Sequence, residues 1–123
     1  MDKENKANSD YSIYSKITDF KDYINQYMIN EIPENKRNLR IHFQDEMYEM
    51  SKNMFYATYN KGNVRMKYLV ELQVNISMID MMLLEIKKIK SIKKNRLDAS
   101  ISKLSDIKNI VYGWKLREES KSK

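Results

Sequence analysis

A group of side chains whose types and spacing could bind a metal ion surrounds His42, the only histidine of the chain. Asp45, Glu46 and Glu49 follow it at helical spacing. Carboxylates and histidines form the metal sites of di-iron four-helix proteins, but those sites require a Glu-x-x-His pair from each of two helices. The chain contains no Glu-x-x-His sequence. We therefore expect no metal centre.

The rest of the composition offers little material for catalysis. The chain of 123 residues has no cysteine, which excludes disulfides, thiol nucleophiles and thiolate metal sites. It also has no glycine-rich phosphate-binding loop. These features predict one domain that is not an enzyme and carries no cofactor. The lack of an apolar N-terminal segment and of any apolar run of bilayer length predicts a soluble, cytoplasmic protein without membrane association.

Positive charge is concentrated in residues 86–96, "IKKIKSIKKNR", which contain six cations and no acid. Removing these six from the 23 Lys and Arg leaves 17, equal to the number of Asp and Glu, so this stretch accounts for the whole net charge of +6. Such an excess indicates nucleic acid, an acidic protein or an anionic membrane surface as a partner. Lysines near a helix C-terminus also complement its dipole, but that effect fades within one turn. Phosphate binding therefore explains the group better than helix stabilisation alone.

Apolar periodicity predicts four helices. Only Gly62, Gly113 and Pro33 interrupt the chain, which favours long helices over strands and turns. Each helix carries one stripe of apolar residues at intervals of three to four. The four stripes are Ile13, Tyr14, Ile17, Phe20, Ile24, Tyr27 and Met28; Leu39, Phe43, Met47, Met50, Met54 and Ala57; Leu69, Leu72, Ile76, Ile79, Leu83 and Ile86; and Leu97, Ile101, Leu104, Ile107, Val111 and Trp114.

The boundaries follow from the stripes and the breakers. We expect helices from near Tyr11 to Asn30, from Pro33–Lys36 to just before Asn60, from near Val64 to the basic stretch, and from Leu97 onward with Asp98 or Ser100 as its cap. Residues 1–10 are then a disordered N-terminal tail, residues 11–116 the helical domain, and residues 117–123 a polar C-terminal tail.

Short connections determine how these helices pack. A loop of a few residues cannot carry the chain back to its starting end, so the fold is predicted to be all-α, an antiparallel up-down-up-down four-helix bundle. The first and third loops then meet at one end, where we expect a nucleic-acid or partner-binding surface, called here the basic pole. It consists of Lys36, Arg37, Arg40, Lys87, Lys88, Lys90, Lys93, Lys94 and Arg96, and Lys103 is a candidate extension. Because most of these residues are lysines, binding should depend on salt and only weakly on sequence.

Other residues are candidates for packing or for a subunit interface. Gly113 lies inside the last stripe, where glycine costs about 1 kcal/mol relative to alanine, so it either ends the helix or allows a neighbouring helix to approach. We favour continuation of the helix, with Trp114 as a core or interface anchor. Apolar and aromatic residues off the main stripes would supply an oligomer interface; these are Tyr48, Phe55, Tyr56, Tyr68, Met78 and Met82.

Three segments carry a resemblance to a known family: "IPENKRNLRIHF", "NKGNVRMKYLVEL" and "IVYGWKL". Their order resembles the accessory variability determinant (Avd) proteins of diversity-generating retroelements, over roughly Ile13 to Leu116. The most specific pieces are the Pro-x-x-Lys-Arg segment at Pro33–Arg37 and the pair Gly113 and Trp114. Related bundle proteins are encoded in intervening sequences of 23S ribosomal RNA genes. Their hallmark Ile-Pro-Ala-Asn-Ile-Ala-Glu-Gly is absent here, which favours the retroelement branch.

The resemblance implies a specific function. It implies a basic four-helix bundle that assembles into a homopentamer and binds the reverse transcriptase of the retroelement together with RNA or cDNA. Such a protein supports mutagenic retrohoming without being a catalyst. The alternative is an oligomeric bundle of the intervening-sequence type, or a generic protein-interaction bundle without a nucleic-acid role. The middle of the third predicted helix, "NISMIDMMLLE", has no cation, so the predicted binding residues come from the basic pole alone.

Overall fold

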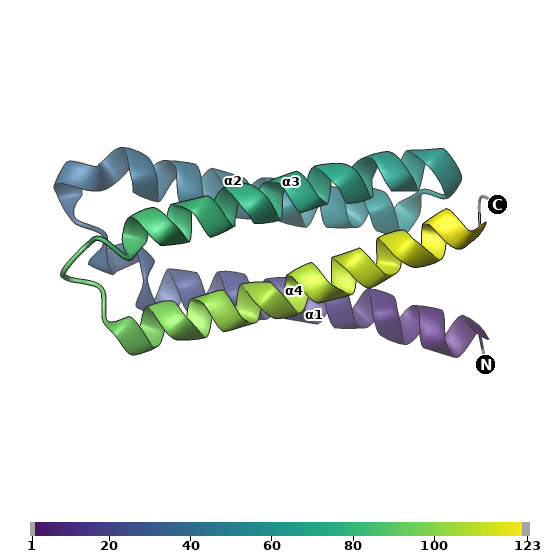
Figure 1. The fold of residues 1–123 in the computed structure, drawn as a ribbon, viewed down its shortest axis with the longest axis horizontal. Coiled ribbons are helices and arrows are strands. Elements are labelled where there is room, and N and C mark those ends of the chain that lie inside the picture. Colours follow the sequence, from purple (N-terminus) through teal and green to yellow (C-terminus); the bar gives the residue numbers. More distant parts are fainter. Residues whose placement is uncertain (1, 122–123) are drawn as a thin grey trace.

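Four long helices form the protein (Figure 1). The computed structural model describes the backbone of residues 2–121 and the side chains of residues 12–121. The helices are α1 (Asp2–Tyr27), α2 (Arg37–Tyr59), α3 (Gly62–Ile86) and α4 (Lys94–Lys121). Consecutive helices run antiparallel, and α4 packs back against α1. The described residues contain no strand, so the predicted all-α four-helix bundle is confirmed.

The two ends of the bundle differ in their connections. Figure 1 shows the α1–α2 and α3–α4 connections at one end, and the short α2–α3 turn with both ends of the chain at the other. None of the helices in the described part of the chain is both long and apolar enough to cross a bilayer.

A single proline shapes the connection from α1 to α2. Pro33 has extended backbone angles (φ −61°, ψ 153°) and separates two short 3₁₀ turns, Ile29–Glu31 and Glu34–Lys36. Ile29 and Ile32 are buried and attach this connection to the core. The α-helical part of α2 therefore begins at Arg37, directly after the predicted start.

The turn between α2 and α3 is tighter than predicted. Gly62 adopts φ +61°, a left-handed conformation that glycine takes without the steric cost of a Cβ atom. The side chain of Asn60 donates to the carbonyl of Tyr56 at 2.7 Å, which pairs one of the free carbonyls at the end of α2. The third helix consequently begins at Gly62, two residues before the predicted Val64.

The predicted stripes form one hydrophobic core, with three exceptions. Tyr14, Tyr27 and Ile101 are 47%, 37% and 38% exposed. Buried members of the same stripe, one or three residues away, already fill the side of the helix that faces the core. The side chains of these three residues therefore point outward. Met82 is buried and Met81 is half exposed, so Met82 belongs to the core and not to an interface.

Helix α4 is longer than predicted at both ends. It begins at Lys94, where the carbonyl of Lys93 accepts from the backbone N–H groups of Arg96 and Leu97. Asp98 and Ser100 therefore lie inside the helix and do not cap it. The Ser100 hydroxyl is buried and donates to the carbonyl of Arg96 at 2.8 Å. No glycine or proline separates the basic stretch from Leu97, so the helix extends upstream of its apolar stripe.

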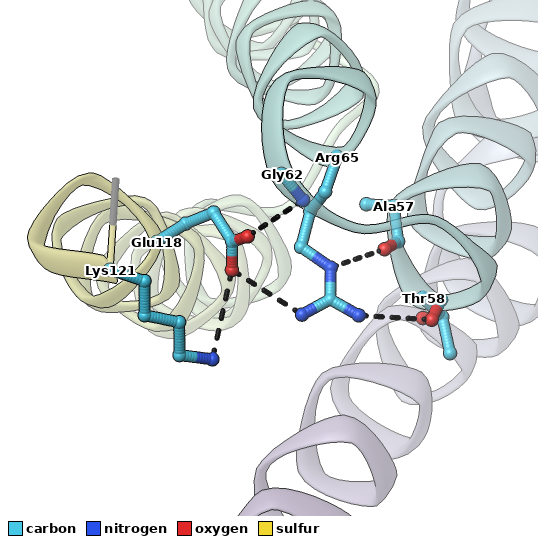
Figure 2. Close-up of polar contacts among 6 residues, drawn as sticks. All are labelled: Ala57, Thr58, Gly62, Arg65, Glu118 and Lys121. Carbon is cyan, nitrogen blue, oxygen red and sulfur yellow. Dashed lines mark hydrogen bonds and ion pairs between the residues drawn. The ribbon is translucent and has the colours of Figure 1, made fainter. Parts of the chain in front are cut away.

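The C-terminal segment predicted as a polar tail continues α4 as far as Lys121. Figure 2 shows the reason. The Glu118 carboxylate is buried, accepts from the backbone N–H of Gly62 at 3.0 Å, and lies 3.4 Å from Nη1 of Arg65. Arg65 in turn donates to the carbonyls of Ala57 and Thr58 at 2.8 and 3.2 Å. These contacts join the last turn of α2, the first turn of α3 and the end of α4.

The N-terminal boundary also differs. The backbone of α1 is helical from Asp2, well before the predicted start near Tyr11, and residues 2–27 contain neither glycine nor proline. The sequence predicted that residues 1–10 form a disordered tail. The side chains of this segment lie outside the described residues.

A polar contact crosses the core between α2 and α3. The Asn53 amide donates to Oδ1 of Asn75 at 2.7 Å, and both side chains are buried. The Asn75 amide donates in turn to the carboxylate of Glu46 at 3.0 Å. A buried amide pair is stable only in one alignment of the two helices, because sliding either helix would leave unpaired polar groups in the core.

Candidate nucleic-acid interface

The basic pole forms where the sequence predicted it. The α1–α2 connection with the first turn of α2 and the α3–α4 connection with the first turn of α4 lie at the same end of the bundle (Figure 1). They are also bonded to each other, because the hydroxyl of Ser91 donates to the carbonyl of Glu31 at 2.8 Å. The two basic segments are therefore held together before any ligand binds.

Seven of the predicted cations face solvent and have no carboxylate partner among the described side chains. They are Lys36, Arg37, Lys87, Lys88, Lys90, Lys93 and Lys94. Over the residues whose side chains are described, none of these seven takes part in an ion pair. A cation without an internal partner retains its full capacity to pair with a ligand anion, so this set is the part of the basic pole that is available to a polyanion.

The other two predicted residues are engaged within the protein. Arg40 donates to the carbonyl of Ile32 at 2.6 Å and lies 3.8 Å from the Glu34 carboxylate. It therefore fixes the connection that leads into α2. Its Nε atom is buried and has no hydrogen-bond partner within the described part of the chain.

Arg96 plays the corresponding role for the other connection. Its Nη1 donates to the carbonyl of Tyr27 at 3.3 Å and lies 4.0 Å from the Glu31 carboxylate. Its guanidinium carbon lies 5.2 Å from the centre of the Tyr27 ring. Arg40 and Arg96 thus organise the basic pole and leave the contact with solvent mainly to the lysines.

Acidic residues weaken the pole less than their number suggests. Glu31 and Glu34 are occupied by the two arginines, whereas Glu85 and Asp98 are exposed beside the lysines. Lys103, predicted as a possible extension, instead forms an ion pair with Asp19 at 2.8 Å, so the pole ends before it.

The helix dipoles at this end largely cancel. The N-terminal ends of α2 and α4 carry partial positive charge, and the C-terminal ends of α1 and α3 carry partial negative charge. The potential of the basic pole is therefore set by its side chains. This distribution is typical of a surface that contacts phosphates without reading bases.

A second surface, on the outside of α3, is apolar. It consists of Val70, Val74, Met78, Met81 and Leu84 and is called here the α3 face; these side chains are 36% to 59% exposed. A hollow of about 360 Å³ lies over most of them. Of this set, only Met78 was predicted from the sequence as an interface residue. The others follow a second stripe, offset from the buried one, whose spacing of three and four residues was the signal that could have revealed them.

Exposed aromatic residues gather on α2. Tyr48, Phe55 and Tyr56 are more than 40% exposed, in agreement with the prediction for residues off the stripes. The Phe55 ring packs 5.9 Å from Tyr14 of α1 and 6.4 Å from Tyr59. Tyr68, also predicted for this set, is only partly exposed, because its ring stacks 4.7 Å from that of Tyr56.

Gly113 and Trp114 have separate roles. Trp114 is buried and lies 5.5 Å from the guanidinium carbon of Arg65, so it is a core residue. The helix continues through Gly113, as favoured from the sequence. Among residues 12–121, no neighbouring helix approaches Gly113 closely, since a Cβ atom there would meet only the side chain of Arg117, at 3.4 Å. Close helix contact is therefore not the reason for this glycine.

His42, the starting point for a metal site, is exposed on α2. Within residues 12–121, no three His, Cys, Asp or Glu side chains gather in a way that could hold a metal ion. Comparison of the chain with models of protein families, with curated proteins and with solved structures gave no match.

Proposed function

We propose that the basic pole binds the sugar-phosphate backbone of nucleic acid. The observation that supports this proposal most directly is the set of seven exposed cations without an internal carboxylate partner. Their ion-pairing capacity is not used by the fold, and the bond between Ser91 and Glu31 presents them as one surface. Because lysine contacts phosphate as a point charge, binding is weakly sequence-specific and depends steeply on salt.

The wider proposal rests on the resemblance to the Avd proteins. We propose a cytoplasmic, non-catalytic accessory protein of a diversity-generating retroelement, which binds the reverse transcriptase and RNA or cDNA and so supports mutagenic retrohoming. The α3 face supports association with other subunits, because contiguous exposed apolar side chains commonly mark protein interfaces. The expected assembly is a homopentamer.

The test neutralises the lysines of the α3–α4 connection. A variant with Lys87, Lys88, Lys90, Lys93 and Lys94 changed to glutamine keeps the arginines that organise the pole. Fluorescence anisotropy with labelled RNA and DNA at low salt should show clear binding by the unaltered protein and loss of most affinity in the variant. Circular dichroism serves as the check of folding. Equal binding by both folded proteins would refute the proposal.

The second candidate function is a protein-interaction bundle with no nucleic-acid role, including the type encoded in ribosomal RNA intervening sequences. The α3 face and the aromatic residues of α2 favour it. In that case the lysines serve only solubility. A discrete oligomer without polyanion affinity at low salt would support this candidate over the first.

A further inference from the structure

A pair of tyrosines borders the basic pole on α1. The Tyr23 and Tyr27 rings lie 4.9 Å apart at a tilt of 52°. Arg96 lies over Tyr27, and the Lys103 ammonium lies over Tyr23, each 5.2 Å from the ring centre. Tyr27 is nevertheless 37% exposed. Part of this residue therefore remains open to solvent next to Arg96, which α4 holds over the ring.

We infer that the nucleic acid at the basic pole is single-stranded and that one of its bases stacks on Tyr27. This inference rests on the proposed nucleic-acid binding and specifies its ligand. A stacked base needs an accessible π surface next to cations that hold the adjoining phosphates, which is the arrangement found in proteins that bind single strands. Tyr27 supplies the ring, and Lys93 and Lys94 supply the cations.

The fold holds these groups close together. Lys94 is the first residue of α4 and Lys93 directly precedes it, two and three residues before Arg96; three residues of a helix span only about 5 Å along the axis. Arg96 is fixed at Tyr27 by its bond to the Tyr27 carbonyl and its contact with the ring. The ring and the cations therefore fit neighbouring parts of a short stretch of one strand.

A duplex can contact the cations of this surface but not the Tyr27 ring. Its bases are stacked on each other and leave no face free for Tyr27, so it gains only the phosphate contacts. A single strand gains the phosphate contacts and the stacking, which is worth about 1–3 kcal/mol per base by alanine substitution. The chemistry is the same for RNA and DNA, because every base has a π face.

The test compares strands that differ only in their bases. Fluorescence anisotropy at fixed salt would measure binding of the unaltered protein to labelled 15-nucleotide RNA and DNA strands without internal pairing, to their duplexes, and to an abasic DNA strand of equal length. We expect the base-bearing strands to bind about tenfold more tightly than the abasic strand. Equal affinity for the abasic and base-bearing strands would overturn the inference while leaving phosphate binding intact. Absence of binding to every strand would overturn the proposed function itself.

Variants then locate the stacking. Tyr27→Ala keeps the backbone carbonyl to which Arg96 donates, and should lower affinity for base-bearing strands about tenfold while leaving affinity for the abasic strand unchanged. Tyr27→Phe keeps the ring and should bind as the unaltered protein does. Tyr59→Ala is the matched control, since Tyr59 is 79% exposed at the opposite end of α2. An equal loss for Tyr27→Ala on both kinds of strand would show that the ring does not contact a base.

Discussion

The guanidinium of Arg65 lies 3.4 Å from the carboxylate of Glu118, and these two side chains are only 3% and 7% exposed. They are separated by 53 residues in the sequence. Arg65 also pairs the last carbonyls of α2, and Glu118 pairs the first backbone N–H of α3 (Figure 2). One ion pair therefore secures three helices at the end of the bundle opposite the basic pole.

We expect Glu118→Gln to destabilise the protein by about 3 kcal/mol, because removal of one partner leaves a buried charge without compensation. Urea unfolding followed by circular dichroism measures the change. Glu71→Gln is the control, since Glu71 is exposed on α3; surface substitutions of this kind change stability by about 0.5 kcal/mol or less. Similar losses in both variants would contradict the role given to Glu118.

The amide pair in the core should show energetic coupling. Asn53→Ala leaves Oδ1 of Asn75 without its donor, so we expect a loss of about 1–3 kcal/mol. Asn75→Ala should cost a similar amount, and the double variant should cost less than the sum by about 1 kcal/mol. Denaturant unfolding of the three variants provides the cycle, with Gln44→Ala on the exposed surface of α2 as the reference. Strict additivity would mean that the two amides act independently.

Salt dependence should distinguish the basic pole from other lysines. For a single-stranded ligand, each contact between a cation and a phosphate adds about 0.7 to the magnitude of the slope of log affinity against log salt. Lys87→Gln combined with Lys88→Gln removes two such contacts and should reduce that magnitude by about 1.4. The control changes two exposed lysines at the opposite end, Lys61 and Lys67, to glutamine. Anisotropy titrations between low and moderate salt measure both slopes. Equal reductions in the two variants would indicate that the whole surface binds, without a specific pole.

Gly113→Ala should stabilise the protein by about 0.5–1 kcal/mol, since alanine removes the cost of glycine in a helix interior. Among the side chains that the structure describes, the added Cβ atom meets only the flexible end of Arg117, at an ordinary contact distance of 3.4 Å. Thermal and urea unfolding test this expectation. A loss of stability would reveal a steric restriction, such as a subunit packed against this position in the oligomer.

The α3 face should control association. Val74→Glu and Met81→Glu place charge on side chains that are 56% and 48% exposed, so they should dissociate an oligomer while leaving the isolated bundle folded. Sedimentation or light scattering gives the mass, and circular dichroism gives the helix content. Gln44→Glu adds the same charge at an exposed polar position of α2. An unchanged oligomer in both α3 variants would exclude this face as a subunit interface.

The bundle could be predicted from the sequence because the apolar residues recur at regular helical spacing. The buried stripes, the breakers Pro33 and Gly62, and the meeting of two basic segments at one end all follow from spacing and loop length. The ends of α4 could not be obtained in the same way. Glu118 lies in a segment with the composition of a polar tail. It is buried because it pairs with Arg65, which lies far away in the sequence.

The meeting of the two basic segments at one end of the bundle was predicted, but the different contacts of the individual cations were not. Charge counting identifies nine cations without distinguishing those that face solvent unpaired from those that make contacts within the fold. Arg40 and Arg96 differ from the lysines because backbone carbonyls of the α1–α2 connection and of the end of α1 lie within reach of their guanidinium groups. That difference arises from the tertiary structure and leaves no local pattern in the sequence.

The bond between Ser91 and Glu31 bears on the kinetics of ligand capture. Since the Ser91 hydroxyl and the Arg96–Glu31 ion pair already join the two connections, the two segments do not have to be brought together when a polyanion arrives, and less entropy is lost on binding. Association should then be governed by diffusion and charge. Replacing Ser91 by alanine would test this effect, because it removes one of the two links and leaves every charge in the sequence.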